Sequence, residues 1–246
     1  MPREARKISE SGFYHIVYRG INHQNIFEEE QDFEYMLEIL KVLKEDIKFE
    51  IHAYCLMTNH VHILLKENHP GDISTIMKRL LIKYVMKFNR KYQRSGALIE
   101  SRYKSKVVEV DEYFIPLIIY IHQNPQRAGL VKKLEEYKYS SYREYLGESE
   151  LVETSLSVDM LGKKEWIKAH QQIIENTFEV EGRKKLSGEE IRQKILKITN
   201  NIVPAEIERM EKEERNKILK VLKNEGLSIR ELERATGIAR GIIAKS

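Results

Sequence analysis

Residues 57–65 read Met-Thr-Asn-His-Val-His-Ile-Leu-Leu, two histidines within an apolar run that is typical of a β-strand. Side chains alternate between the two faces of a strand, so His60 and His62 point to one side while Val61 points to the other. Their Cα atoms then lie roughly 6.6 Å apart, and both imidazoles can reach one divalent ion at about 2.0–2.2 Å. Two ordinary half-exposed histidines would give the same pattern, so the motif needs support from elsewhere in the chain.

The segments around this strand predict a split βαβ arrangement. Thr58 and Asn59 form a tight turn before it, and the other strands are expected at 12–19, 49–56 and 105–110, beside the histidine strand at 60–66. Helical periodicity predicts helices at 28–46 and 73–92. The resulting order, β-α-β-β-α-β, is that of a ferredoxin-like α+β fold.

A second segment of interest contains Tyr120 and Asn124. We expect a helix here, with Asp111 as a plausible N-cap, Pro116 in its first turn and Pro125 at its end. Tyr120 and Asn124 are then one turn apart on the same face of the helix. A phenol and an amide oxygen on one stripe could approach a metal ion held by the histidine pair.

Alternatives remain open at this point. Gln123, three residues after Tyr120, is a competing third metal ligand. Tyr113 lies on a similar helix face and is a competing nucleophile, although it has no amide partner one turn later. A tyrosine ordinarily packs in the core or at its rim. Tyr120 is a candidate nucleophile only because it occurs together with the histidine pair and Asn124.

Composition excludes some classes of protein and favours others. The chain has 246 residues and a single cysteine, Cys55, so a disulfide framework and a multi-thiolate metal site are excluded. No apolar run is long enough for a membrane span, and no signal-peptide pattern is visible. We therefore expect a cytoplasmic protein, associated with the nucleoid of a prokaryote and not with a membrane.

Positive charge is concentrated in residues 72–106. Ten basic residues stand there against two acidic ones, whereas the formal net charge of the whole chain is only +4. The helix at 73–92 has an apolar stripe, and many of the basic side chains lie off that stripe. Arg102-Tyr103-Lys104 adds an aromatic residue among basic ones, a combination that suits unpaired bases and phosphates. Residues 72–106 are therefore expected to form a groove for single-stranded DNA.

Residues from about 150 onwards are rich in lysine and glutamate and have helical periodicity. Near the end, a helix closed by Gly226 is followed by a capping box that begins at Ser228, and the turn 235–237 precedes a last helix at 238–244. Two short helices about a glycine turn are typical of a helix-turn-helix. A plain helical hairpin is the alternative. We accordingly divide the chain into 1–147, a helical linker region 148–212 and a helix-turn-helix at 213–246.

The quoted motifs together resemble a known family. The histidine pair at 60–62, followed by the Tyr120 segment through residue 131, is similar to the single-tyrosine HUH transposases of small insertion sequences, and most similar to the REP-associated tyrosine transposase branch. Residues 14–22 resemble the first strand of that family and its following loop, and 89–105 resemble its basic middle region. The likeness covers about residues 8–147 in the correct order. Thr58 stands where the family usually has proline, which affects a turn and not the chemistry.

This resemblance implies an HUH endonuclease core: an antiparallel sheet with helices on one face and a catalytic helix at its end. It implies that Tyr120 attacks DNA, giving a 5′-phosphotyrosine link and a free 3′-hydroxyl. We expect His60, His62 and Asn124 to bind Mg²⁺ or Mn²⁺, because neutral nitrogen and oxygen ligands suit a weakly held catalytic ion. The expected activity is metal-dependent nicking and rejoining of single-stranded or hairpin DNA, as in DNA transposition and recombination.

Ten further residues are candidates for contacts with DNA. They are Arg19, Asn22, Lys83, Lys87, Arg90, Arg94, Arg102, Tyr103, Lys104 and Arg127. Two other functions stay open: a domesticated protein that processes repeated hairpins for its host, and a non-catalytic DNA-binding regulator with a vestigial metal site. The sequence leaves open whether the protein is a monomer or a homodimer.

Overall fold

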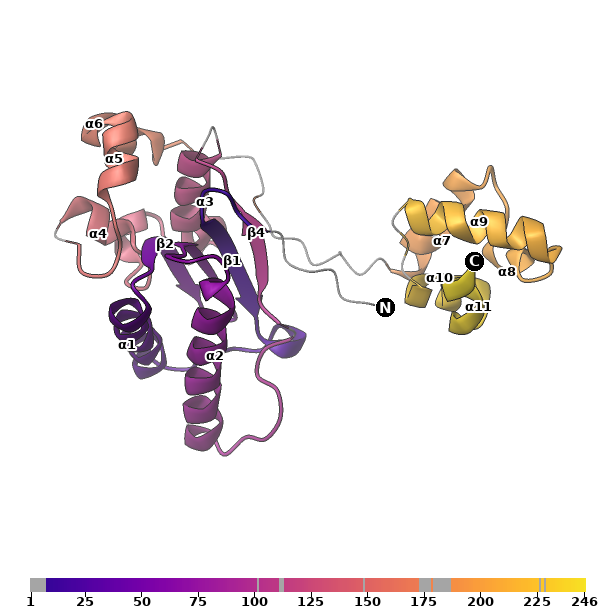
Figure 1. Ribbon diagram of the computed structural model, residues 1–246, viewed down its shortest axis with the longest axis horizontal. Coiled ribbons are helices and arrows are strands. Elements are labelled where there is room, and N and C mark those ends of the chain that lie inside the picture. The colour runs from indigo at the N-terminus through magenta and orange to yellow at the C-terminus, as the bar shows by residue number, and fades with distance from the viewer. Residues whose placement is uncertain are drawn as a thin grey trace. The chain divides into compact units, whose positions relative to one another are not determined.

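The computed structural model describes residues 8–100, 102–110, 113–147, 149–172, 178, 187–225, 227 and 229–246. The chain forms two compact units, Met1–Val180 and Glu181–Ser246, each with its own hydrophobic core. The first unit contains the sheet and the second is helical (Figure 1). The expected caps at Asp111, Gly226 and Ser228 fall outside the described residues.

The first unit is built on a four-stranded antiparallel sheet. Its strands are β1 (Phe13–Arg19), β2 (Glu50–Met57), β3 (His60–Lys66) and β4 (Lys104–Val107), in the spatial order β2-β3-β1-β4. β2 and β3 form a hairpin around the Thr58-Asn59 turn, as the sequence predicts. The chain order of strands and helices confirms the ferredoxin-like α+β fold.

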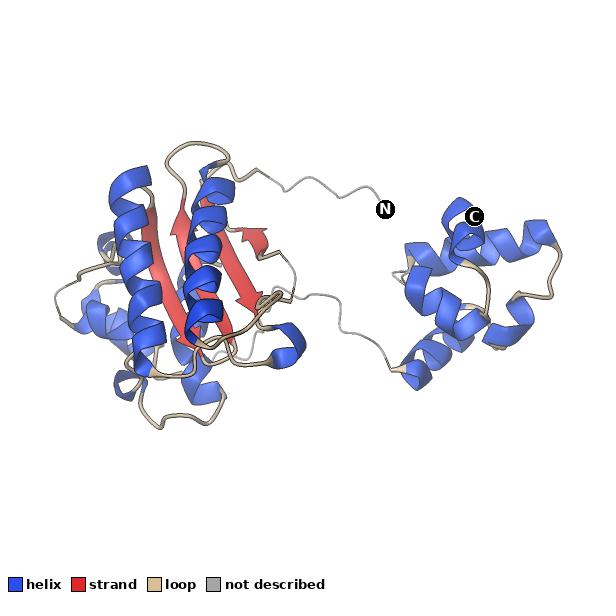
Figure 2. Cartoon of the chain, turned by 90° about the horizontal axis from the view of Figure 1, so that it is seen from below, coloured by secondary structure: helices blue, strands red, loops and turns tan. Residues whose placement is uncertain are grey.

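Helices cover both faces of this sheet. Helices α1 (Glu30–Ile47) and α2 (Asp72–Lys91) pack together on one face, where Tyr18 of β1 reaches Met36 of α1. Helix α3 (Phe114–Arg127) lies on the other face, where Phe114 packs against Phe13 at 5.1 Å between ring centroids. Figure 1 shows α3 above the sheet with α1 and α2 below it, and Figure 2 shows the latter two in front of the strands. The expected position of α3 at the end of the sheet is therefore wrong.

Helix α3 also differs from expectation at its end, because it continues through Pro125 to Arg127. Proline cannot donate the hydrogen bond that the carbonyl of Ile121 would normally accept in a helix. The side-chain amide of Asn124 compensates, since its Nδ2 donates to the carbonyls of Tyr120 at 2.8 Å and Ile121 at 3.4 Å. Pro116 lies in the first turn, as predicted.

Residues beyond 147 still belong to the first unit. After η1 (Ile21–His23) and η2 (Leu134–Glu136), the short helices α4 (Tyr142–Leu146), α5 (Ser155–Leu161) and α6 (Lys163–Ala169) complete it. Trp166 of α6 is buried in the same core as the sheet. The expected domain edge at 147 is therefore wrong, because the core includes side chains from both sides of it.

The second unit contains five described helices. They are α7 (Gly188–Ile198), α8 (Pro204–Ile207), α9 (Lys212–Asn224), α10 (Ile229–Thr236) and α11 (Arg240–Lys245). Their apolar faces meet in a core that includes Ile195, Leu219, Leu232 and Ile243. The expected all-α C-terminal extension is thus confirmed, although its core joins residues on both sides of the division that we placed at 212. In the described part of the chain, no helix has the length and apolarity needed to cross a membrane.

Candidate active site

The histidine pair lies on the α3 face of the sheet. The rings of His60 and His62 are 5.2 Å apart between centroids, so the two side chains share one face as their spacing predicts. Antiparallel register places Arg19 of β1 opposite His60, and Val17 opposite His62. Both sheet faces are covered, so Val61 on the other face is fully buried and His62 is buried as well.

Each of these histidines is oriented through its Nδ1 atom. Nδ1 of His60 lies 2.7 Å from Oδ1 of Asn59, which can only accept, so the neutral ring carries its proton on Nδ1. Nδ1 of His62 lies 3.0 Å from Nε2 of His15, a buried histidine of β1. Among the described residues, neither Nε2 atom of the pair has a hydrogen bond. Each Nε2 is therefore the nitrogen that can bind a metal ion.

Burial keeps these imidazoles neutral. It lowers the pKa of His60 to about 4 and that of His15 to about 3, because the charged ring would lose its hydration. The pKa of His62 is lowered well below its ordinary value, first by burial and then by the nearby His15 and His60. Arg19 also lowers the pKa of both members of the pair. A neutral imidazole is the form that binds metal.

Helix α3 brings Tyr120 to this site from a distant part of the sequence. The Tyr120 ring lies 5.7 Å from the His62 ring and 6.5 Å from the His15 ring, edge-on to both. Its ring also contacts Phe178 at 5.5 Å, and the side chain is 3% exposed. Asn124 is half-buried one turn later on the same helix. Because its Nδ2 is directed to the helix backbone, its Oδ1 is the outward atom.

Basic side chains border the same face. The guanidinium of Arg127 lies over the Tyr120 ring, with Cζ 5.2 Å from the centroid. On the edge strand β4, Lys104 and Lys106 are register partners of Val17 and His15, so they share the face that carries the histidines. Arg19 stands directly beside His60. Positive charge thus lies on both sides of the histidines and the tyrosine, where it can neutralise phosphates.

The donor set fits a weakly held Mg²⁺ or Mn²⁺. Within the described residues, no three side chains drawn from His, Cys, Asp and Glu form a metal site. An ion here would depend on the two Nε2 atoms and on Oδ1 of Asn124, which has no other hydrogen bond in the described part of the chain. Neutral nitrogen and amide oxygen ligands suit a hard or borderline catalytic ion better than structural zinc.

The structure does not form the single groove expected from residues 72–106. Lys83, Lys87 and Arg90 are exposed on α2, which packs on the opposite face of the sheet from Tyr120. The ammonium of Lys87 lies 3.5 Å from the centroid of the Tyr35 ring in α1. These three residues are therefore separated from the histidines by the thickness of the sheet.

Four other predicted DNA contacts have different surroundings. Asn22 is exposed in the turn after β1, and Arg94 donates to Oε1 of Gln24 in that loop at 2.8 Å. Arg102 is exposed shortly before β4. Tyr103 is buried, with its hydroxyl 3.5 Å from the carbonyl of Ile73. The burial of Tyr103 contradicts its expected contact with DNA, because its ring is part of the core.

The two competing residues take other roles. Nε2 of Gln123 donates to the carbonyls of His170 at 3.1 Å and Gln172 at 2.7 Å, so its amide fastens α3 to the chain after α6. Tyr113 is exposed at the N-cap of α3, two turns before Tyr120. The geometry thus favours Asn124 over Gln123 and Tyr120 over Tyr113.

Sequence reasoning missed His15, Asn59 and Lys106 as parts of this site. His15 and Lys106 are recognised only through the pairing of β1 with β3 and β4, which the sequence does not encode locally. Asn59 directly precedes the histidine pair, so the sequence alone could have indicated a hydrogen bond between its side chain and His60.

Known proteins are similar to this chain in sequence. The profile of the family described as "Transposase IS200 like" matches residues 9–124. A REP-associated tyrosine transposase of Haemophilus influenzae is 28% identical over 109 residues, which cover 40% of this chain and 61% of that protein. The chain thus spans about three fifths of the length of this curated relative.

One solved structure shows the same fold. A REP-associated tyrosine transposase bound to a REP hairpin matches with a TM-score of 0.50 and 18% identity, over 60% of this chain and 87% of that one. A transposase from Deinococcus radiodurans matches with a TM-score of 0.34 and 18% identity, over 55% and 97% of the two chains. The range that matches the family profile includes both the histidine pair and Tyr120. Residues 9–124 are therefore similar to a domain of the IS200-like transposases.

Proposed function

We propose that this chain cleaves and rejoins single-stranded DNA as a transposase, with Tyr120 as the nucleophile. The observation that carries the proposal is the packing of the Tyr120 ring against His62, 5.7 Å away between centroids. Two segments far apart in the sequence thus place a phenol beside two imidazoles with available Nε2 atoms. Among the described tyrosines, Tyr120 is the one whose ring packs against this pair.

In the proposed reaction, the phenolic oxygen of Tyr120 attacks the scissile phosphorus as its proton leaves. The bond from phosphorus to the 3′ oxygen breaks, and that oxygen takes up a proton to become a free 3′-hydroxyl. The product is a 5′-phosphotyrosine, which retains the energy of the phosphodiester bond. A second 3′-hydroxyl can then reverse the step and rejoin the strand without ATP.

The chain's own residues would orient these groups. Arg127, stacked over the Tyr120 ring, favours the phenolate electrostatically and is close enough to meet the phosphate that the phenol attacks. His15 and Asn59 hold the rings of His62 and His60 by their Nδ1 atoms. His60, His62 and Asn124 would hold Mg²⁺ or Mn²⁺, whose charge would stabilise the negative charge developing on the phosphate oxygens.

The proposed substrate is single-stranded DNA next to a hairpin. Arg19, Lys104 and Lys106 line the face that carries the nucleophile, and they can neutralise successive phosphates. The solved relative that shares this fold was determined with a REP hairpin bound. Both observations support a folded-back strand as partner, with its unpaired flank reaching Tyr120.

A covalent-adduct assay tests this proposal. The protein is incubated with labelled single-stranded hairpin DNA and Mn²⁺, and a denaturing gel reveals any DNA that remains attached to protein. Tyr120→Phe removes one oxygen and little volume, so we expect a folded protein that forms no adduct. Tyr113→Phe is the matched control and should form the adduct normally. An adduct with Tyr120→Phe would refute the assignment.

A further inference from the structure

The second unit ends in two helices joined by a tight turn, a feature that strand cleavage by the first unit does not use. Helix α10 stops at Thr236, Gly237 has a left-handed φ of +79°, and α11 begins at Arg240. Leu232 and Ile238 are buried on the inner side of this motif, together with Ile243 of α11. Its packing is fixed, so the outward side of α11 is presented as a rigid surface.

The outward side of α11 is open. Ile242 is 41% exposed although it is a large apolar residue, and Arg240 and Ala244 are exposed beside it. An added methyl group on Gly241 would meet no atom within 4 Å. A ligand can therefore approach the backbone of this helix closely. An exposed aliphatic side chain next to an arginine suits the thymine methyl groups and acceptor atoms of a DNA major groove.

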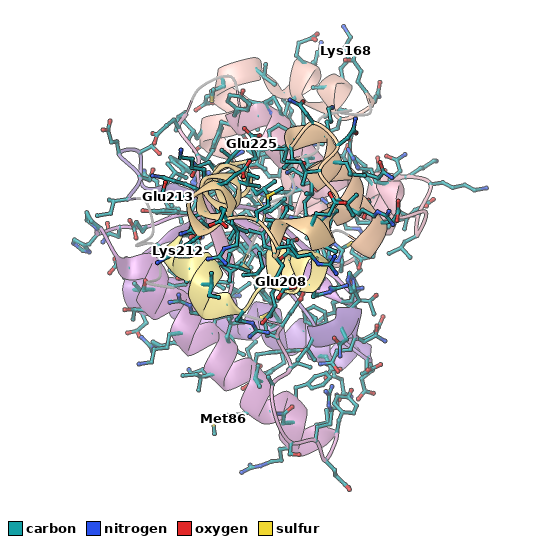
Figure 3. All side chains as sticks on the ribbon, turned by 90° about the vertical axis from the view of Figure 1, so that its right-hand side faces the viewer. Met86, Lys168, Glu208, Lys212, Glu213 and Glu225 are labelled. Carbon is teal, nitrogen blue, oxygen red and sulfur yellow. The ribbon has the colours of Figure 1, made fainter. Side chains whose placement is uncertain are left out.

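A groove of about 440 Å³ separates α11 from the first half of α9. Lys212, Arg215 and Asn216 line it from α9, and Ala239, Gly241 and Ile242 line it from α11. Lys212 is exposed and lies beside the yellow ribbon of the chain's C-terminal end (Figure 3). The groove thus combines one apolar wall with one basic wall.

Arg215 is the unusual member of this wall. Its Nε is buried yet has no hydrogen-bond partner in the described structure, and its Nη2 makes only a long contact of 3.4 Å with Asn216. A guanidinium N–H that has lost its water and gained no acceptor is energetically unfavourable. Because Arg215 lines the groove, the rest of its guanidinium is the group that can meet an anion there, and a phosphate is the anion that arginine recognises best.

Acidic side chains restrict where such a phosphate can lie. Glu233 pairs with Arg240 at 2.5 Å, and the carboxylate of Glu208 lies beside Gly237 at the turn. Negative charge at the turn repels a phosphate there. Glu213 and Glu214 also lie in the first turn of α9, but neither lines the groove, so Lys212 and Arg215 remain for the contact with a nucleic-acid backbone.

We propose that α11 and this groove form a second DNA site, which binds duplex DNA. The outward side of α11 would enter the major groove, while Lys212 and Arg215 contact phosphates of the adjacent strand. This site contains none of the residues of the Tyr120 site and takes a different substrate, because the proposed function of the first unit is cleavage of single strands whereas a helix-turn-helix binds in the major groove of a duplex.

The test uses the full chain and a short labelled duplex of mixed sequence, with anisotropy measured at several salt concentrations. The double variant Lys212→Gln, Arg215→Gln removes both proposed phosphate contacts. We expect weaker duplex binding and a salt slope reduced by about two, because each phosphate contact on B-DNA contributes about 0.9. The matched control is Lys217→Gln, Lys220→Gln, which removes the same charge from exposed positions of α9 outside the groove.

A second variant guards against a folding defect of the first. Ile242→Glu changes an exposed side chain on α11 and adds a negative charge to the surface that would face DNA. It should weaken duplex binding strongly while covalent-adduct formation on a single-stranded hairpin stays unchanged. Duplex binding equal to that of the control pair in both variants would overturn the proposal. A parallel loss of adduct formation would also overturn it, since the groove would then serve the hairpin.

Discussion

Replacing Trp166 by alanine tests whether residues after 147 stabilise the domain that carries Tyr120. Trp166 is 1% exposed, stacks on Tyr145 with 4.3 Å between ring centroids, and lies 3.8 Å from the His170 ring. Removing a buried tryptophan costs about 3–5 kcal/mol of unfolding free energy. Its Nε1 has no partner among the described residues, so removal also relieves a penalty of roughly 1–3 kcal/mol.

From the middle of each range, the net loss expected for Trp166→Ala is about 2 kcal/mol. With a urea dependence of about 2 kcal/mol per molar, the unfolding midpoint should fall by about 1 M. Trp166→Phe keeps an aromatic ring and loses the unpaired N–H. We expect its midpoint to remain within about 0.5 M of the parent, since the loss of volume and the relief of the penalty oppose each other.

Tyrosine near-UV circular dichroism is the appropriate probe of this unfolding. All 13 tyrosines lie between residues 14 and 145, so their signal reports the first unit alone and survives removal of the single tryptophan. A fragment 1–147 should likewise unfold at lower urea than the full chain. A urea midpoint unchanged by Trp166→Ala would refute the reasoning, because α6 would then contribute nothing to the stability of the first unit.

Three further predictions concern the site and its surroundings. His62→Ala should steeply raise the Mn²⁺ concentration needed for adduct formation. Asn124→Ala should raise it less, because water can replace a neutral oxygen ligand. Mn²⁺ titrations of both variants that match the parent protein would place the ion elsewhere. Neutralising Lys104 and Lys106 should reduce the salt slope of hairpin binding by about 0.7 per lost phosphate contact, whereas neutralising two exposed lysines of α2 should leave the slope unchanged. The opposite result would show that the DNA contacts lie on α2. Burial lowers the pKa of His170 to about 4, so the unfolded chain binds a proton at this residue before the folded chain does, once the pH falls below about 6.5. The urea midpoint should therefore fall between pH 7 and pH 4, and it should fall less in a His170→Gln variant.

Local sequence patterns predicted the elements of the sheet well. The histidine strand was expected at 60–66 and the structure has His60–Lys66. Helix α2 differs by one residue at each end from the expected 73–92. These elements follow from rules with a range of a few residues: alternation along a strand, a repeat of three to four along a helix, and a turn between strands. Pro125 does not end α3 as expected, because the side chain of Asn124 donates the hydrogen bond that proline cannot donate to the carbonyl of Ile121.

Contacts between distant segments were predicted less well, since they depend on which strands pair and which face a helix covers. His15 became part of the site only because β1 lies next to β3, a choice made by the whole sheet. The domain edge at 147 was misplaced for a related reason. A glycine and a run of polar residues mark a loop, but they carry no information on whether a later tryptophan returns to the same core.

The misplaced DNA groove shows how charge patterns must be read in this fold. Basic residues outnumber acidic ones by ten to two in residues 72–106, yet this segment spans one helix that covers the sheet and one strand within it. Lys83 on α2 and Lys104 on β4 therefore belong to surfaces that face opposite directions. Tyr120 lies on the sheet face that Lys104 and Lys106 share. These two lysines, with Arg19 and Arg127, are therefore nearer to the nucleophile than the more numerous basic residues of α2. The exposed charge of α2 can then attract DNA at long range without contacting the phosphate that Tyr120 attacks.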